Sequence, residues 1–357
     1  MKKIFTLCVL AIALLGTPFT DAQAQEQARK QTTDNHRNDL INTLKERIKL
    51  YGYVQTGYTY EETAGEKTNT FDIKRAIVWA NAQITDQWTA QLMYNFGGTS
   101  SVGKSTGGKI LEAWTAYRIC PELQIQVGQF KTPFTIENPL SPCTLETIDC
   151  NAQMVSYMLG GLIGNHGGRD LGLMVFGELF NKTIKYELAL MQGQGLNFTD
   201  GNNQKEFVGK LSAKPAEWLL LSVSTMQGTG YCTTARTDYN TVAAGENFKR
   251  TRYAAGAQLD LKPLSLRTEY LAGKDGDVKM DGFYASTTIH LCKCLDAIAS
   301  YDYANYNHDT QAKETRLTGG LQYWFYPQCR LQAQYQFRTP KHGDDTNRIQ
   351  MQLQIRF

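Results

Sequence analysis

Residues 347–357 read NRIQMQLQIRF, and from Ile349 onward apolar and polar side chains alternate without a break. The apolar set is Ile349, Met351, Leu353, Ile355 and Phe357, and the polar set is Gln350, Gln352, Gln354 and Arg356. Successive side chains of a β-strand point to opposite faces, so the stretch predicts a strand with one apolar and one polar face. The wall of a membrane β-barrel needs such strands, because lipid touches one face and water the other.

The same period of two recurs through the chain in segments of about ten residues, the length that a tilted strand needs to cross a bilayer. We count sixteen segments, near residues 49–60, 71–84, 88–96, 109–118, 123–129, 168–179, 183–191, 205–214, 218–228, 250–261, 264–274, 281–291, 295–306, 315–325, 329–338 and 347–357.

The connections between these segments alternate between short and long. The short ones are residues 85–87, 119–122, 180–182, 215–217, 262–263, 292–294 and 326–328, and the long ones include 61–70, 97–108, 130–167, 192–204 and 229–249. Outer-membrane barrels have short periplasmic turns and long external loops. A soluble β-sandwich also has alternating faces, but it would not show this parity. The prediction is an all-β fold, a 16-stranded antiparallel transmembrane barrel around an aqueous channel.

The amino terminus predicts export. Lys2 and Lys3 precede an apolar run from Ile4 to Gly16, and the small residues of 22–24 provide a cleavage site, so residues 1–24 read as a signal peptide. The alternative is a membrane helix, but the run is shorter than the ~20 residues that such a helix needs. Helical spacing over 34–49 predicts a short helix within a periplasmic segment, 25–47, and the barrel follows over 48–357.

Composition argues against several other classes of protein. The formal charge is +3, and the basic residues do not gather into a run that would follow a phosphate backbone, so no nucleic-acid partner is predicted. No second long apolar stretch supports a helical membrane protein. Of the eight cysteines, Cys143 and Cys150 could close a small disulfide loop. Cys292 and Cys294 lack the usual zinc spacing, and no metal or cofactor is predicted.

Strand parity predicts a lumen wall with a net positive charge. The predicted lumen cations are Lys185, Lys210, Arg252, Arg267, Arg316, Arg330, Arg338 and Arg356, against the acids Glu112, Glu187, Glu269 and Asp302. Arg75 shares the parity of Asn81 and Gln83, which favours the lumen, although a one-residue slip would replace it with Lys74.

Three stretches resemble the phosphate-selective porin O and P family, in the same order along the chain. They are residues 110–114 (ILEAW), residues 127–134 (VGQFKTPF) followed by Glu137, and residues 169–172 (RDLG) followed by Gly177. The resemblance implies a homotrimer of sixteen-stranded barrels, each with its third external loop, here 130–167, folded inward to narrow the pore. It also implies that the terminal Phe357 is presented to the barrel-assembly machinery. Family members that prefer phosphate have a dense ladder of arginines, whereas this wall mixes basic residues with glutamines and acids.

Lys131 and Arg169 flank this longest connection and are predicted to stand near the constriction, where cations can replace part of the hydration of an anion. The alternative is that both side chains only solvate the ends of the loop. The predicted pore and anion-binding set is completed by Arg75, Lys210, Arg252, Arg267 and Arg316.

The function predicted from the sequence is passive diffusion through a porin in the outer membrane of a Gram-negative bacterium. Its partners would be outer-membrane lipid and small anionic or polar solutes, with a preference for phosphate-like anions. The alternatives are a non-selective porin and a structural or adhesive barrel. An enzyme is not predicted: His290 is the one histidine within a predicted strand, with Ser286 and Thr288 on its face, and no Gly-x-Ser-x-Gly elbow accompanies it.

Overall fold

The computed structural model describes residues 46–99, 107–149, 152–160, 163, 167–233 and 242–357. The predicted signal peptide, 1–24, and nearly all of the predicted helical segment, 25–47, lie outside the described residues. The predicted helix was placed too far along the chain at its end, because Ile48 and Lys49 already belong to the first strand. Residues 49–357 form one compact unit.

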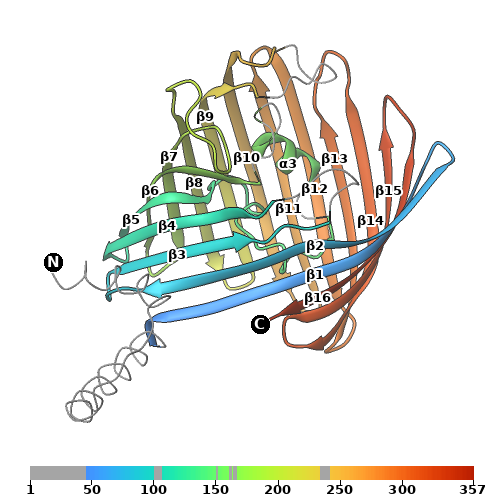
Figure 1. The fold of residues 1–357 in the computed structure, drawn as a ribbon, viewed down its shortest axis with the longest axis horizontal. Coiled ribbons are helices and arrows are strands. Elements are labelled where there is room, and N and C mark those ends of the chain that lie inside the picture. The colour runs from blue at the N-terminus through green and yellow to red at the C-terminus, as the bar shows by residue number, and fades with distance from the viewer. Residues whose placement is uncertain (1–45, 100–106, 150–151, 161–162, 164–166, 234–241) are drawn as a thin grey trace, which may run out of the picture. The chain divides into compact units, whose positions relative to one another are not determined.

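Sixteen antiparallel strands form a closed barrel in which each strand pairs with its neighbour in sequence (Figure 1). They are β1 (Ile48–Thr63), β2 (Glu66–Gln83), β3 (Trp88–Asn95), β4 (Lys109–Cys120), β5 (Leu123–Lys131), β6 (Arg169–Leu179), β7 (Ile184–Met191), β8 (Glu206–Ala216), β9 (Leu219–Tyr231), β10 (Asn247–Leu261), β11 (Leu264–Asp275), β12 (Val278–His290), β13 (Leu295–Asn305), β14 (Lys313–Tyr326), β15 (Cys329–Pro340) and β16 (Thr346–Arg356).

The barrel closes between its first and last strands. Val54 lies opposite Ile355, and Gly52 and Phe357 exchange two backbone hydrogen bonds of 2.9 Å. Closure leaves no strand edge unpaired, which a hydrocarbon environment requires because it offers no water to exposed backbone groups. The predicted all-β, sixteen-stranded antiparallel fold is confirmed.

One predicted long connection is a tight turn. Residues 61–70 were assigned to a loop, but β1 and β2 continue through them and only Ala64 and Gly65 join the two strands. Both residues have positive φ, 53° and 84°, as in the two-residue turns whose twist matches that of the flanking strands. A long hairpin that extends beyond the bilayer needs no apolar face. Its polar, glycine-containing sequence therefore resembled that of a loop, although the two strands continue through it.

The two faces of the wall differ as the alternation predicts. On β16, Leu353 is 41% exposed to the outside, whereas its neighbour Gln352 is 1% exposed on the lumen side. On β15, Tyr335 is 49% exposed and Gln334 only 3%. The polar side chains are buried, so the lumen next to these strands is occupied by other parts of the chain.

The occupant is the connection between β5 and β6, which carries the short helix α3 (Gln153–Leu159) inside the ring of strands, beside β12 and β13 (Figure 1). Nearly all side chains of α3 are buried, and they pack on apolar wall residues that face inward. These wall residues are Met174, Ala189, Met191, Val208, Met226, Ala254, Leu271 and Met280. The prediction of an aqueous rather than a packed interior is wrong for this part of the barrel, because the loop brings its own apolar side chains and the wall covers them.

No helix among the described residues is long and apolar enough to cross a membrane.

Candidate pore constriction

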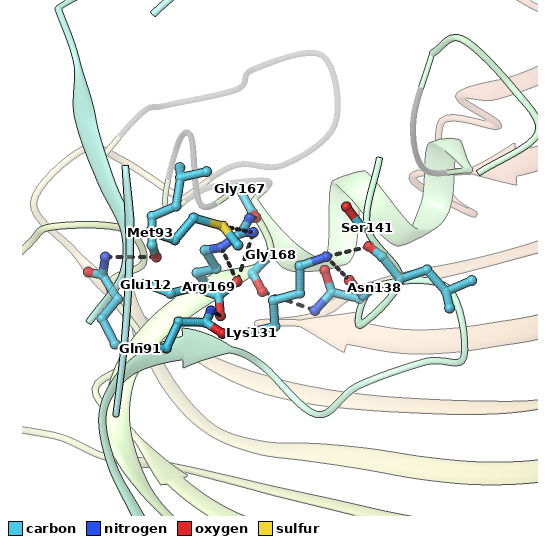
Figure 2. Close-up of polar contacts among 12 residues, drawn as sticks. Gln91, Met93, Glu112, Lys131, Asn138, Ser141, Gly167, Gly168 and Arg169 are labelled. Carbon is cyan, nitrogen blue, oxygen red and sulfur yellow. Dashed lines mark hydrogen bonds and ion pairs between the residues drawn. The ribbon is translucent and has the colours of Figure 1, made fainter. Parts of the chain in front are cut away.

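The lumen loop is the connection between β5 and β6, residues 132–168. Its two ends are joined at a narrow neck beside Lys131, Asn138 and Gly168 (Figure 2). The backbone N–H of Thr132 donates to the carbonyl of Gly168 at 3.0 Å. The Asn138 amide then donates to both of these residues, at 2.8 Å to the Thr132 carbonyl and 3.0 Å to that of Gly168. Lys131 Nζ donates to the carbonyls of Asn138, at 2.8 Å, and Leu140. The loop therefore leaves and re-enters the wall at almost one point.

Glycine is required at the return point of this neck. Gly168 has a φ of +68°, and a Cβ atom there would lie 1.9 Å from Oδ1 of Asn138. Any side chain would both strain the backbone and displace the amide that ties the two ends together.

Arg169, the next residue, is fixed by a buried carboxylate. Its Nε and Nη2 lie 3.1 and 2.9 Å from Oε1 of Glu112 on β4. The other carboxylate oxygen, Oε2, accepts from Gln91 at 2.8 Å and from the Trp114 indole at 3.3 Å. Arg169 is 7% exposed. Its charge is thus balanced inside the protein, and its geometry is set by two guanidinium nitrogens that contact the same carboxylate oxygen.

Side-chain amides of β15 and β16 hold the backbone of the loop against the far wall. Gln334 accepts from the Ile148 N–H at 2.9 Å and donates to the Glu146 carbonyl at 2.7 Å. Gln354 donates to the Cys143 carbonyl at 3.1 Å. Irregular backbone inside a barrel needs such partners, since a buried N–H or C=O without a hydrogen bond is costly.

Two predicted pore arginines also bind the loop directly. Arg267 forms an ion pair of 2.6 Å with Glu146. Arg252 donates to the Met158 carbonyl at the end of α3 and pairs with Asp275 at 2.7 Å. These two residues thereby connect strands β10 and β11 to the loop.

Arg316 acts through an acid that it shares with the loop. Its Nη2 lies 2.6 Å from Oδ2 of Asp302, and the same oxygen accepts the N–H of Gln153, the first residue of α3, at 2.8 Å. Arg267, Arg252 and Arg316 thus lie around one loop rather than along an open channel.

The remaining two residues of the predicted set lie elsewhere on the lumen wall. Lys210 Nζ is 4.0 Å from Glu187, which also pairs with Lys185 at 2.9 Å. Arg75 Nη1 donates to Oε1 of Gln55 at 2.9 Å. The structure therefore brings Lys131 and Arg169 together at the neck, spreads the other five around the wall, and gives every one of them a partner within the protein. An anion-binding role for the set remains a prediction.

An opening remains between the neck and strands β3 to β7. It is a cavity of about 260 Å³, lined by Tyr53, Met93, Glu112, Trp114, Gln126, Phe130, Lys131, Pro133, Pro139, Ser141, Pro142, Arg169, Met174 and Glu187. Three prolines of the loop belong to this lining, and proline has no backbone N–H to donate to a solute. No group of three or more His, Cys, Asp or Glu residues that could hold a metal ion occurs among the described residues.

The comparisons with known proteins agree with this geometry. Residues 48–216 match the family model of the phosphate-selective porins O and P, a range that runs from β1 to the end of β8. The resemblance inferred from the sequence motifs is thereby confirmed over these residues. The chain is an outer-membrane porin. It belongs to the outer membrane of a Gram-negative bacterium, and its family and fold point to a channel rather than an enzyme.

Solved porins share the fold of this porin at low sequence identity. An anion-selective porin from Comamonas acidovorans is 12% identical, covers 87% of this chain and 99% of its own, and has a TM-score of 0.65. OprB from Pseudomonas putida is 10% identical, covers 91% and 97%, and has a TM-score of 0.69. The outer-membrane channel DcaP of Acinetobacter baumannii is 15% identical, covers 87% and 97%, and has a TM-score of 0.59. No match was found among curated protein sequences.

The sequence reasoning missed the residues that seat the loop of this porin. The glutamines of β15 and β16 were read only as part of a polar face, although six of them are at most 4% exposed: Gln332, Gln334, Gln336, Gln350, Gln352 and Gln354. The signal that could have revealed this role is the run of uncharged hydrogen-bond donors and acceptors on these two strands, in a chain with one very long loop. His290 lies at the end of β12, where its Nδ1 is 2.7 Å from Asp296.

Two buried acidic groups, Glu269 and Glu137, hold backbone N–H groups of the seated loop. Oε1 and Oε2 of Glu269 accept the N–H groups of Ile136 and Glu137 at 2.6 and 3.2 Å, and Tyr284 donates to Oε2 at 2.6 Å. The Glu137 carboxylate accepts the N–H of Ala152 at 3.2 Å. Burial raises the pKa of Glu137 to about 7, although Arg267 opposes the shift.

Asn138→Ala should loosen the neck, because it removes both amide donors that bridge the ends of the loop. We expect the closed neck to lose about 1 to 3 kcal/mol of stabilising free energy. The loss should be seen as larger and noisier single-channel currents, while the barrel keeps its heat-modifiable mobility. Asn69→Ala, at an exposed position on β2, is the matched control. Currents of Asn138→Ala that cannot be told from the wild type would contradict a closing role for this amide.

Channel noise should depend on pH through Glu137. Because its pKa lies above the ordinary value of 4.5, the carboxyl group stays protonated up to about pH 7, and the loop loses stability as pH rises through that value. Ionisation places a charge near Glu146 and Glu269, with Arg267 as the facing cation and Tyr284 beside them. Recordings between about pH 5 and 9 should show noise that rises near pH 7 in the wild type and stays flat in Glu137→Gln. Glu178→Gln should behave as wild type, and a Glu137→Gln profile that still rises would refute the assignment.

Proposed function

We propose that this porin lets small hydrophilic solutes diffuse passively across the outer membrane, with a mild preference for anions. The observation that carries the proposal is the lumen loop, which narrows the interior of a closed barrel to an opening beside its neck. A loop of this length is unusual in a compact fold unless it has a function. A constriction that excludes large solutes is the function that its position supports.

The charges around the opening support the preference for anions. Lys131 and Arg169 line it together with Glu112 and Glu187, and Lys185 and Lys210 lie against Glu187. Two cations and two carboxylates therefore line the opening, and two further cations lie against one of these carboxylates.

The preference should be mild because most lumen cations are already paired. Arg250 lies 2.7 Å from Glu206, and Arg252 lies 2.7 Å from Asp275. A paired charge attracts a passing ion less than an isolated one, since the field of its partner opposes its own. We therefore place this porin nearer to a general diffusion pore than to one with a phosphate-binding arginine ladder.

The orientation and assembly that we propose follow from the same reading. The short turns face the periplasm and the long loops face the exterior, as in other outer-membrane barrels. The apolar outer wall contacts lipid, and Phe357 at the end of the last strand is the signal to the assembly machinery. Residues 1–24 direct export, residues 25–47 remain in the periplasm, and three barrels associate as a homotrimer.

A barrel with a structural or adhesive role is the second candidate. It is favoured by the apolar cluster between α3 and the wall, which fills part of the lumen. Steady single-channel current separates the two functions, because a blocked barrel would conduct none.

Reversal potentials under a tenfold potassium chloride gradient test the anion preference. We expect the anion sign and a value well below the roughly 59 mV of a perfectly selective pore. Lys185→Gln removes a lumen cation whose side chain is 43% exposed and should lower the potential, whereas Lys182→Gln, in the turn after β6, should not change it. A potential of the cation sign in the wild type would overturn the anion preference without disproving diffusion.

A further inference from the structure

The turn between β12 and β13 holds two thiols side by side. Cys292 is exposed and Cys294 is half-buried, both are free, and their sulfur atoms are 3.6 Å apart. The hairpin is closed by the Leu291 and Cys292 N–H groups, which donate to the Leu295 carbonyl at 3.0 and 3.2 Å. The backbone of the turn therefore keeps the two sulfur atoms within contact distance.

The pair is distinct among the described cysteines. Cys143, Cys232 and Cys329 are buried, and their sulfur atoms contact oxygen or nitrogen atoms rather than another sulfur. Cys120 is the last residue of β4, at a different turn, and is half-buried. The pair is also remote from the loop neck in the sequence and takes no part in the constriction.

The two thiols differ in acidity. Hydrogen bonds from the backbone N–H and the thiol of Cys294 lower the pKa of Cys292, whereas the bond to Cys292 and partial burial raise the pKa of Cys294. The thiolate is the reactive form of cysteine, so an exposed thiol with a lowered pKa is the one that attacks. A less acidic thiol in contact with it is placed to resolve the product.

We propose that Cys292 and Cys294 form a thiol–disulfide exchange site whose substrate is a disulfide of another molecule. The Cys292 thiolate attacks one sulfur of the substrate, the substrate S–S bond breaks, and the released thiolate takes up the proton that Cys292 lost. Cys294 then loses its proton and attacks the Cys292 sulfur of the mixed disulfide, which expels the second substrate thiolate to be protonated in turn. The pair is oxidised to one disulfide, and the substrate is reduced to two thiols.

The sulfur atoms need only a small movement to complete the second step. They must approach from 3.6 Å to the bond length of about 2.05 Å. The site belongs to the end of the barrel that carries the short turns, so its substrates would come from the compartment which that end faces.

The test uses the full-length folded porin in detergent, reduced, freed of reductant and mixed with dithiobis(nitrobenzoate), an aromatic disulfide. In the wild type we expect rapid release of two thionitrobenzoate equivalents and a product that has lost two hydrogen atoms by mass, without adduct at these residues. Cys294→Ser should stop at a stable mixed disulfide on Cys292. Cys292→Ser should react at about one tenth of the wild-type rate or more slowly still.

Cys120→Ser is the matched control and should react as wild type, and heat-modifiable mobility shows that each variant is folded. Wild-type protein that carries an adduct on both cysteines without closing the internal disulfide would overturn the proposal. Equal reaction rates in Cys292→Ser and Cys294→Ser would also overturn it. Neither result bears on conductance, so the proposed diffusion function is judged separately.

Discussion

Every polar backbone group of the lumen loop must find a hydrogen-bond partner, and this requirement determines how the interior is built. The loop has little regular structure of its own, so the wall supplies the partners. Ser224 accepts the Thr135 N–H at 3.1 Å, Glu269 accepts two N–H groups, and Arg330 donates to the Leu145 carbonyl at 2.7 Å. The polar face of the barrel is thus used twice, as the lining of a pore and as the seat of the loop that narrows it.

Because the polar face also holds the loop, many lumen charges act on the loop rather than on a solute. An arginine that holds a loop carboxylate, as Arg267 holds Glu146, contributes to the position of the constriction more than to the attraction of a solute. The same holds at the neck, where Arg169 is paired with Glu112. Selectivity then depends on the few charges near the remaining opening and on its size. The number of basic residues on the wall is therefore a poor measure of ion selectivity.

The sequence predicted the barrel, its sixteen strands and their inward and outward faces, because a period of two and the alternation of connections are local properties. It did not predict which side chains meet across the lumen. Glu206 and Asp275 neutralise Arg250 and Arg252, yet neither acid was among the predicted lumen acids, although Glu206 lies within the predicted strand 205–214. The apolar residues of α3 gave no sign of their partners either. Contacts between a long loop and a distant wall are set by the closed fold as a whole.

The central claim is that the described residues of the loop over 132–168, the connection between β5 and β6, occupy the lumen, and removing the loop tests that claim most directly. Thr132 and Gly168 are already joined by a hydrogen bond, so a short glycine-serine linker can replace residues 134–166 without moving the wall. Single-channel conductance of this variant should rise severalfold above that of the wild type, with heat-modifiable mobility retained as evidence of a closed barrel. An unchanged conductance in a folded variant would contradict the account.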